Sequence, residues 1–310
     1  MNLTAKIFTD ETAARKHLEK LLWKDGPLCP HCGTLDAATK LKGKSTRPGV
    51  YWCNACQAPY SVTVGTVYER SHIPLHKWLL ATQLLTASKK GMSAHQLMRM
   101  LGLGSYRTAW FMAHRIRLAM APQNQPPLGG EGQIVEADET YLGGKRTGKN
   151  KQGKKHGIAD KKKVMALVER GGKVRSFHVK AVNNRTAQDV LLENADLRSK
   201  LMTDEANHYK GVGETFADHE AVNHSALEYV RGTAYTNTIE GVFSIFKRGM
   251  VGTYQHCGEQ HLHRYLAEFD FRYNNRIKLG VNDTMRAEKA LEGIVGKRLT
   301  YRRTDKAVHA

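Results

Sequence analysis

The chain has 310 residues, of which 48 are Lys or Arg and 29 are Asp or Glu, and its formal net charge is +19. This length allows two or three compact units. The positive charge favours a partner dense in phosphate, although a merely well-solvated basic protein has the same composition. No apolar run approaches the roughly 18 residues of a membrane span, and the start lacks the apolar core of a signal peptide, so we expect a cytoplasmic protein.

The first predicted element is a short amphipathic helix over residues 12–23. Leu18, Leu21 and Leu22 share one stripe of this helix, and the Asp-Gly-Pro sequence at 25–27 ends it. A segment rich in cysteine follows.

Four cysteines form two CxxC pairs with twenty residues between the pairs; they are Cys29, Cys32, Cys53 and Cys56. This spacing is typical of two knuckles that close one tetrahedral zinc site. Four thiolates leave no open coordination position, so we expect one structural Zn²⁺ whose binding stabilises a small ribbon. His31 is a less favoured ligand than the thiols. The fifth cysteine, Cys257, is expected to pack in a core.

A helical segment over 74–88 precedes a predicted helix at 91–100, a turn at 101–104 and a longer helix at 105–120. This pattern favours a helix-turn-helix that binds DNA; a helical hairpin that packs against the rest of the protein is the alternative. If it binds DNA, Tyr106 and Arg107 should approach base edges, while Arg115 and Arg117 hold phosphate.

The segment from 121 to 132 has the Pro and Gly content of a linker. Beyond it, strands are predicted at 133–136, 163–169, 174–179 and 201–203, with helices at 186–194 and beyond Thr236. The sequence therefore predicts a helix and zinc ribbon (1–70), a helix-turn-helix-like region (71–120), the linker (121–132), a mixed α/β catalytic domain (133–290) and a basic tail (291–310).

A run of nine basic residues with one acid, Asp160, occupies 145–163 inside the α/β domain. It is too polar to pack, so we expect either a solvated connector or a loop that contacts the DNA backbone. In the second case Lys145, Lys154 and Lys155 are candidate contacts.

Acidic residues follow two of the predicted strands. Asp138 comes just past an apolar strand, Asp204 ends another, and Glu240 follows Asp204 after thirty-five residues. If the segment around Glu240 is helical, Asn237, Glu240, Ser244 and Lys247 share one face. The two aspartates, at the ends of predicted strands, can therefore converge.

Converging carboxylates suit phosphodiester chemistry, because two Mg²⁺ ions about 3.5–4 Å apart can activate the attacking oxygen and stabilise the leaving oxygen. Asp138 could bridge two Mg²⁺ (or Mn²⁺) ions, with Asp204 on one and Glu240 on the other. Lys247, two helical turns from Glu240, and the adjacent Arg248 could hold DNA phosphate.

Several segments together resemble one family, the DDE-type insertion-sequence transposases with an N-terminal zinc ribbon and an RNase H-like catalytic domain. The resemblance covers nearly the whole chain and is carried by the cysteine knuckles, Ala-Asp-Glu-Thr-Tyr at 137–141, Thr-Asp-Glu at 203–205, Asn-Thr-Ile-Glu at 237–240, Lys-Arg-Gly at 247–249 and the stretch from His261 to Arg276.

The resemblance implies an RNase H-like fold, Mg²⁺-dependent end cleavage and strand transfer, and binding to the terminal inverted repeats of a mobile element. In this family the third metal-site residue is sometimes Asn, so Asn237 is an alternative to Glu240. We favour Glu240 because a carboxylate neutralises a divalent ion and an amide does not. Cutting two DNA ends implies at least a dimer.

Two other functions remain open at this stage: a nuclease of the same fold that cuts without joining, and a DNA-binding regulator built on the ribbon and the helix-turn-helix. His219 and His224 lie between Asp204 and Glu240, where packing or DNA contact is favoured over a general-base role. In the predicted helix 261–276, Arg264, Arg272 and Arg276 are available for phosphate.

Overall fold

The computed structural model describes residues 2–143, 161–223 and 230–300. The chain forms two compact units: the first combines residues 1–122 with 276–310, and the second is continuous from 123 to 275. None of the helices in the described ranges is long and apolar enough to cross a membrane.

The first unit is mainly helical, with a small three-stranded antiparallel sheet in the order β1-β2-β3. Its helices are capped where the sequence places a short polar side chain: Asp10, Ser93, Ser105 and Asn282 each accept a backbone N–H of the first turn that follows. Its elements are η1 (Lys6–Phe8), α1 (Glu11–Leu22), β1 (Ala38–Lys40), β2 (Tyr51–Cys53), β3 (Ala58–Tyr60), α2 (Leu75–Ala87), α3 (Ala94–Met100), α4 (Tyr106–Met120), η6 (Ile277–Leu279) and α9 (Asp283–Glu292).

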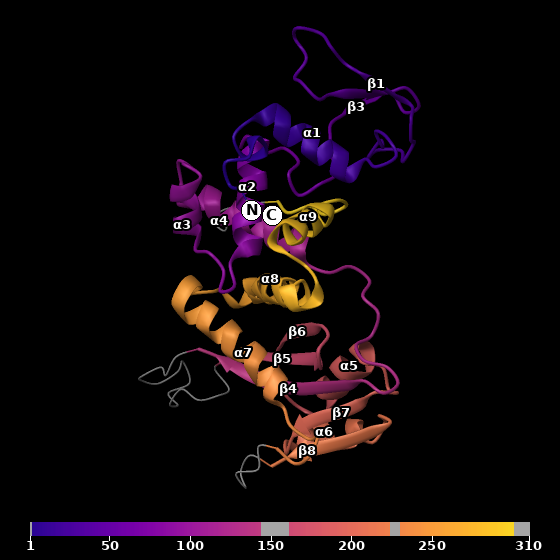
Figure 1. Cartoon of the computed structure of the whole chain (residues 1–310), viewed down its shortest axis with the longest axis vertical. Helices are drawn as coiled ribbons and strands as arrows, with labels where there is room; N and C mark the ends of the chain where they lie inside the picture. Colours follow the sequence, from indigo (N-terminus) through magenta and orange to yellow (C-terminus); the bar gives the residue numbers. More distant parts are fainter. Residues whose placement is uncertain (1, 144–160, 224–229, 301–310) are drawn as a thin grey trace, which may run out of the picture. The chain divides into compact units, whose positions relative to one another are not determined.

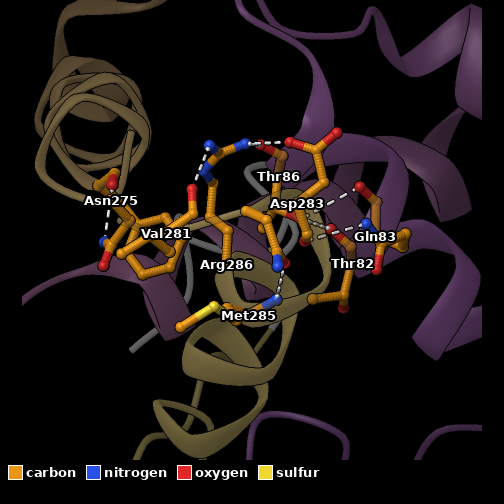
Figure 2. Close-up of polar contacts among 10 residues, drawn as sticks. Thr82, Gln83, Thr86, Asn275, Val281, Asp283, Met285 and Arg286 are labelled. Atoms are coloured by element: carbon orange, nitrogen blue, oxygen red, sulfur yellow. Dashed lines mark hydrogen bonds and ion pairs between the residues drawn. The ribbon is translucent and has the colours of Figure 1, made fainter. Parts of the chain in front are cut away.

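Helix α9 packs against α2 in this first unit, and Figure 2 shows the polar contacts that fix it. The buried Arg286 donates to the carbonyl of Thr86 at 3.3 Å and to the carboxylate of Asp283 at 2.7 Å. Gln83 donates to the carbonyl of Asp283 at 3.2 Å. Residues 276–290, the end of the predicted catalytic range of 133–290, therefore belong to this first unit.

The second unit is built on one five-stranded mixed sheet in the order β6-β5-β4-β7-β8. Strands β4, β5 and β6 pair antiparallel, while β7 and β8 continue the sheet in parallel with β4. The elements are β4 (Ile134–Leu142), β5 (Lys162–Glu169), β6 (Val174–Val179), α5 (Asn184–Asn194), β7 (Lys200–Asp204), α6 (Asn207–Gly213), β8 (Asp218–Val222), α7 (Asn237–Gly249), a π-helical segment η4 (Met250–Tyr254), η5 (Glu259–His261) and α8 (Leu262–Asn274).

Helices cover both faces of this sheet (Figure 1). Apolar side chains of α7 and α8, among them Phe243 and Leu266, form a core with Val164 and Val168 of β5. On the opposite face of the sheet, α5 and α6 pack against the apolar side chains of β4, β5 and β7 that point to that face. Because alternate residues of β5 point to opposite faces, Val164, Ala166 and Val168 lie in the first core, and Met165 and Leu167 lie in the second.

The mixed α/β class of the second unit is confirmed. The helix and strand segments predicted from the sequence are present, and β4 extends to Leu142, well beyond its predicted end at residue 136. Strand β8 was not predicted, because its sequence Asp-His-Glu-Ala-Val has too few apolar residues to indicate a strand.

Candidate metal centres and nucleic-acid contacts

The four cysteines of the CxxC pairs converge on one point. Their sulfur atoms all lie within 4.8 Å of one another, and the Cys29–Cys56 and Cys32–Cys53 pairs are each 3.7 Å apart. A tetrahedral Zn²⁺ with Zn–S bonds of about 2.3 Å requires sulfur atoms roughly 3.8 Å apart. The arrangement therefore fits one zinc ion, and His31 is outside the group.

The thiols of this group cannot all ionise without a cation. Hydrogen bonds from Thr34, whose hydroxyl lies 3.2 Å from the sulfur, lower the pKa of Cys32 to about 6. Desolvation, and then hydrogen bonds with the neighbouring thiols, raise the pKa of Cys56 to about 12. A divalent ion would remove this conflict by deprotonating every ligand.

Asp138 lies in the middle of β4, not just past the strand as predicted, and Asp204 is the last residue of the neighbouring parallel strand β7. The pairing of β4 with β7 places Ile134 opposite Lys200 and Glu136 opposite Met202. Continued by two residues, this register sets Asp138 opposite Asp204. Since paired residues of parallel strands point to the same face, both carboxylates project on the side of the sheet that α7 and α8 cover.

Glu240 comes from the first turn of α7. It is exposed, as are Asn237, Ser244 and Lys247, so the four residues form one polar side of the helix as predicted. The hydroxyl of Thr236 lies 3.3 Å from the Glu240 carboxylate and donates to it. Neither Asn237 nor Glu240 is buried by the fold, so the geometry does not choose between them.

The electrostatics of Asp138 show that these acids share one neighbourhood. Its pKa is raised to about 8 by desolvation first, then by the charges of Asp204, Glu139 and Glu240; only the backbone N–H of Glu139 acts in the other direction. The pKa of Asp204 is raised too, by desolvation and by Glu139. A site with these properties binds either protons or a cation.

The acids do not form a ready single-ion site. In the described ranges, the cysteine cluster is the one group of three or more Cys, His, Asp or Glu side chains close enough to hold an ion. Carboxylates that hold two ions about 3.5–4 Å apart need not touch one another, because each bonds to a different ion. The donor set, all oxygen, matches the preference of Mg²⁺ and Mn²⁺.

Glu139, the neighbour of Asp138, faces the opposite side of the sheet. It accepts a hydrogen bond from the Tyr209 hydroxyl at 2.9 Å and lies 3.1 Å from a ring nitrogen of His208, both on α6. These residues were not among the predicted site residues. The signal available was the alternation of a strand, which sends adjacent acids to opposite faces.

The residues predicted to contact DNA fall into an exposed group and a buried group. Arg107 and Tyr106 are exposed at the start of α4, and Arg248 is exposed on α7. Arg115 and Arg117 are buried, so the expectation that they hold phosphate is corrected. Arg115 instead donates to the carbonyl of Glu69 at 2.6 Å and lies over the ring of Trp78.

Burial also decides the outcome for the arginines predicted at 261–276, for His219 and for Cys257. Arg272 is buried and paired with Glu268, so it is not available for phosphate, whereas Arg264 and Arg276 are half-buried. His219 is half-buried with a ring nitrogen 2.9 Å from the Thr203 hydroxyl, and Cys257 packs in the core as predicted. The remaining predicted contacts, Lys145, Lys154, Lys155 and His224, lie outside the described residues.

Two family models match the chain in separate places. Residues 127–274, nearly all of the second unit, match the ISXO2-like transposase domain. Residues 9–59, which contain α1 and the cysteine cluster, match the transposase zinc-ribbon domain. The chain belongs to the insertion-sequence transposases. The resemblance drawn from its motifs is thereby confirmed, and the cysteine cluster is the metal site of a zinc ribbon.

A relative of this transposase is an uncharacterized protein in transposable element ISH50 of Halobacterium salinarum. It is 28% identical over 282 residues, which cover 86% of this chain and 92% of that protein. Among solved structures, a chain of the simian T-cell lymphotropic virus intasome in complex with PP2A regulatory subunit B56 gamma matches with a TM-score of 0.29 and 16% identity. That match covers 56% of this chain and 63%, less than two thirds, of the other.

Proposed function

We propose that this transposase cuts and rejoins DNA at the terminal inverted repeats of its insertion sequence, using two Mg²⁺ or Mn²⁺ ions held by Asp138, Asp204 and Glu240. The observation that carries the proposal is the β4–β7 register, which sets Asp138 and Asp204 side by side within the matched transposase domain. The raised pKa of Asp138, due to desolvation and neighbouring acids, supports a cation at this place.

Each residue has a separate task in this proposal. The ions, when bound, lower the energy of attack and departure of the two phosphodiester oxygens. Asp138, Asp204 and Glu240 would supply the carboxylates that hold the ions. Lys247 and Arg248 bind the DNA backbone from the last turn of α7. Glu240 is preferred to Asn237 as third ligand because it supplies charge.

The finer features of the fold belong to the same proposal. Three antiparallel strands continued by two parallel ones, with helices on both faces, support an RNase H-like domain. Helices α3 and α4, joined by a short turn, support a helix-turn-helix in which Tyr106 and Arg107 meet base edges. The ribbon carries one structural Zn²⁺. Two DNA ends call for at least a dimer.

The test is cleavage and joining of supercoiled plasmid that carries the DNA flanking the gene, with Mg²⁺ present. The natural protein is compared with Asp204→Ala, Glu240→Gln and Asn237→Ala. Asp189→Ala, at an exposed acid on α5, is the matched control. We expect joined products from the natural protein and the control, none from Asp204→Ala, and a loss of roughly 10²–10³-fold or more for the true third ligand.

Other outcomes point to other functions. DNA that is nicked but never joined would indicate a nuclease of the same fold. Sequence-specific binding without cleavage would indicate a regulator that works through the ribbon and the helix-turn-helix. Equal activity of Asp204→Ala and the control would remove the acidic centre from the mechanism.

A further inference from the structure

A buried ion pair joins the strand of Asp138 to the loop that leads into α7. Glu136, two residues before Asp138 on β4, is fully buried, and its carboxylate lies 2.6 Å from the guanidinium of Arg170. Alternation along the strand puts Glu136 and Asp138 on the same face. A buried pair of this kind adds little stability compared with apolar residues, so its presence calls for another explanation.

Arg170 uses its other nitrogens on the segment that immediately precedes α7. It donates to the carbonyl of Thr233 at 2.8 Å and to the carbonyl of Tyr235 at 2.7 Å. Its guanidinium also lies 3.5 Å from the ring centre of Tyr235. The planar guanidinium, with several donors in fixed directions, thus fixes both the loop and the carboxylate of Glu136.

Glu136 in turn caps α7 from outside the helix. Its second oxygen accepts the backbone N–H of Ile239, in the first turn, at 2.9 Å. Thr236 occupies the N-cap position but makes no capping bond of its own. In the same turn, the Thr236 hydroxyl donates to the carboxylate of Glu240, so Glu136 and Glu240 both contact the start of α7.

We propose that Glu136 and Arg170 are positioning residues that hold the first turn of α7, and with it Glu240, at a fixed place relative to Asp138. The inference rests on the proposed metal-dependent function. Strand β4 then carries Asp138, a proposed metal ligand, and two residues earlier Glu136, which fixes the helix that carries Glu240. Partners that orient metal ligands in this way commonly change metal affinity by about 10–100-fold when altered.

The experiment measures Mn²⁺ affinity of the full chain by calorimetry and by electron paramagnetic resonance, in a double-mutant cycle of Arg170→Lys with Glu240→Gln. Lysine keeps the charge but cannot reach both carbonyls and the carboxylate. Glu136→Gln, close in shape, is the second variant. Arg198→Lys, at the exposed Arg198–Asp196 pair of the same unit, is the matched control. Asn237→Ala replaces Glu240→Gln in a parallel cycle, since the same turn carries both residues.

We expect Arg170→Lys and Glu136→Gln to weaken Mn²⁺ binding about tenfold or more in the natural background and hardly at all once Glu240 is replaced. The same pattern with Asn237→Ala in place of Glu240→Gln would assign the positioned ligand to Asn237 and overturn the role of Glu240. A lower Tm with unchanged Mn²⁺ affinity, or an equal loss of Mn²⁺ affinity in both backgrounds, would show that the Glu136–Arg170 pair has only a structural role. If no single replacement of Glu240 or Asn237 alters Mn²⁺ binding, the proposed metal site itself fails.

Discussion

The zinc ribbon and the acidic centre are two candidate metal sites that the chain builds in opposite ways. The ribbon takes its four ligands from two short turns, with sulfur atoms already at tetrahedral distances. The acidic centre would take its three proposed ligands from two strands and a helix spread over about a third of the sequence, and these side chains do not close around one point. A structural metal site takes all its ligands from the protein, whereas a catalytic metal site leaves coordination positions open for the substrate.

The two sites also differ in how far folding depends on the metal. The ribbon has a small core around Tyr51 and Tyr60, too small to fold without zinc. The acidic centre lies on a sheet with apolar cores on both faces, which folds without an ion. Removing metal should therefore unfold the first site but only restore the repulsion between carboxylates at the second.

The largest effect is expected from Cys53→Ser. Zinc binding contributes roughly 10–16 kcal/mol to the folding of small zinc domains, so loss of one thiolate should release the ion and unfold the ribbon. Zinc content falls from one ion per chain to none, and limited proteolysis cuts between residues 29 and 60. Cys257→Ser, outside the cluster, is the control and keeps its zinc. A Cys53→Ser protein that retains stoichiometric zinc would contradict the comparison.

Asp138→Asn should have opposite effects without and with divalent cations. The folded pKa of Asp138 is about 8, above its ordinary value, so its contribution to stability is full below about pH 4 and is lost as the pH rises toward 8. At pH 8 without metal, the variant should therefore be the more stable protein. With free Mn²⁺ at about 1,000 times its Kd, the natural protein gains about 4 kcal/mol and the variant far less.

Denaturant unfolding with and without Mn²⁺ measures both effects of Asp138→Asn. Asp189→Asn, at an exposed position of α5, should behave as the natural protein does. Equal stabilisation of natural protein and Asp138→Asn by Mn²⁺ would show that the ion binds elsewhere.

Asp270→Asn tests a buried acid of the same unit that takes no part in either centre. Asp270 accepts two hydrogen bonds of 2.7 Å from Ser176, yet burial raises its pKa to about 6. As the pH rises from about 4 to about 6, the natural protein should lose on the order of 2–3 kcal/mol of unfolding free energy relative to Asp270→Asn. Unfolding curves across this pH range measure the gap. A gap that stays constant with pH would contradict the assignment, and Mn²⁺ should leave the gap unchanged.

The smallest effect is expected from Tyr209→Phe, which removes the hydroxyl that holds Glu139 on the α6 side of the sheet. One hydrogen bond to a charged group contributes about 1.5–3 kcal/mol at most, and the remaining contact with His208 should reduce the loss to about 1 kcal/mol. Mn²⁺ affinity should not change. A weaker Mn²⁺ site in this variant would add Glu139 to the acidic centre.

The features that could be predicted from the sequence are those that depend on residues close together in the chain. The CxxC spacing indicated the ribbon, and the 3.6-residue period indicated the polar side of α7 that carries Asn237 and Glu240. The convergence of Asp138 and Asp204 could be anticipated because each directly follows or ends a predicted apolar strand, although β4 in fact continues past Asp138 to Leu142. Their alignment depends on a register with Lys200 opposite Ile134, which no local pattern specifies.

Contacts between distant segments were out of reach. Arg115 and Arg117 were expected on the surface because Arg is seldom buried, but Arg115 is held by a carbonyl and an aromatic ring from other segments. Glu136 gave a faint signal, as a charged residue at the end of the predicted apolar strand at 133–136. Its partner Arg170 lies in a turn thirty-four residues away, and nothing in the spacing links the two.

The discontinuous first unit imposes an order on synthesis. Helix α9, which Arg286 and Gln83 fasten to α2, is translated after the last residue of the second unit. At about 5–20 residues per second, the seventeen residues from Arg276 to Glu292 are added roughly one to three seconds later. The nascent second unit can thus fold while the first still lacks a helix, and the ribbon-bearing unit is completed only after the whole second unit has been synthesised.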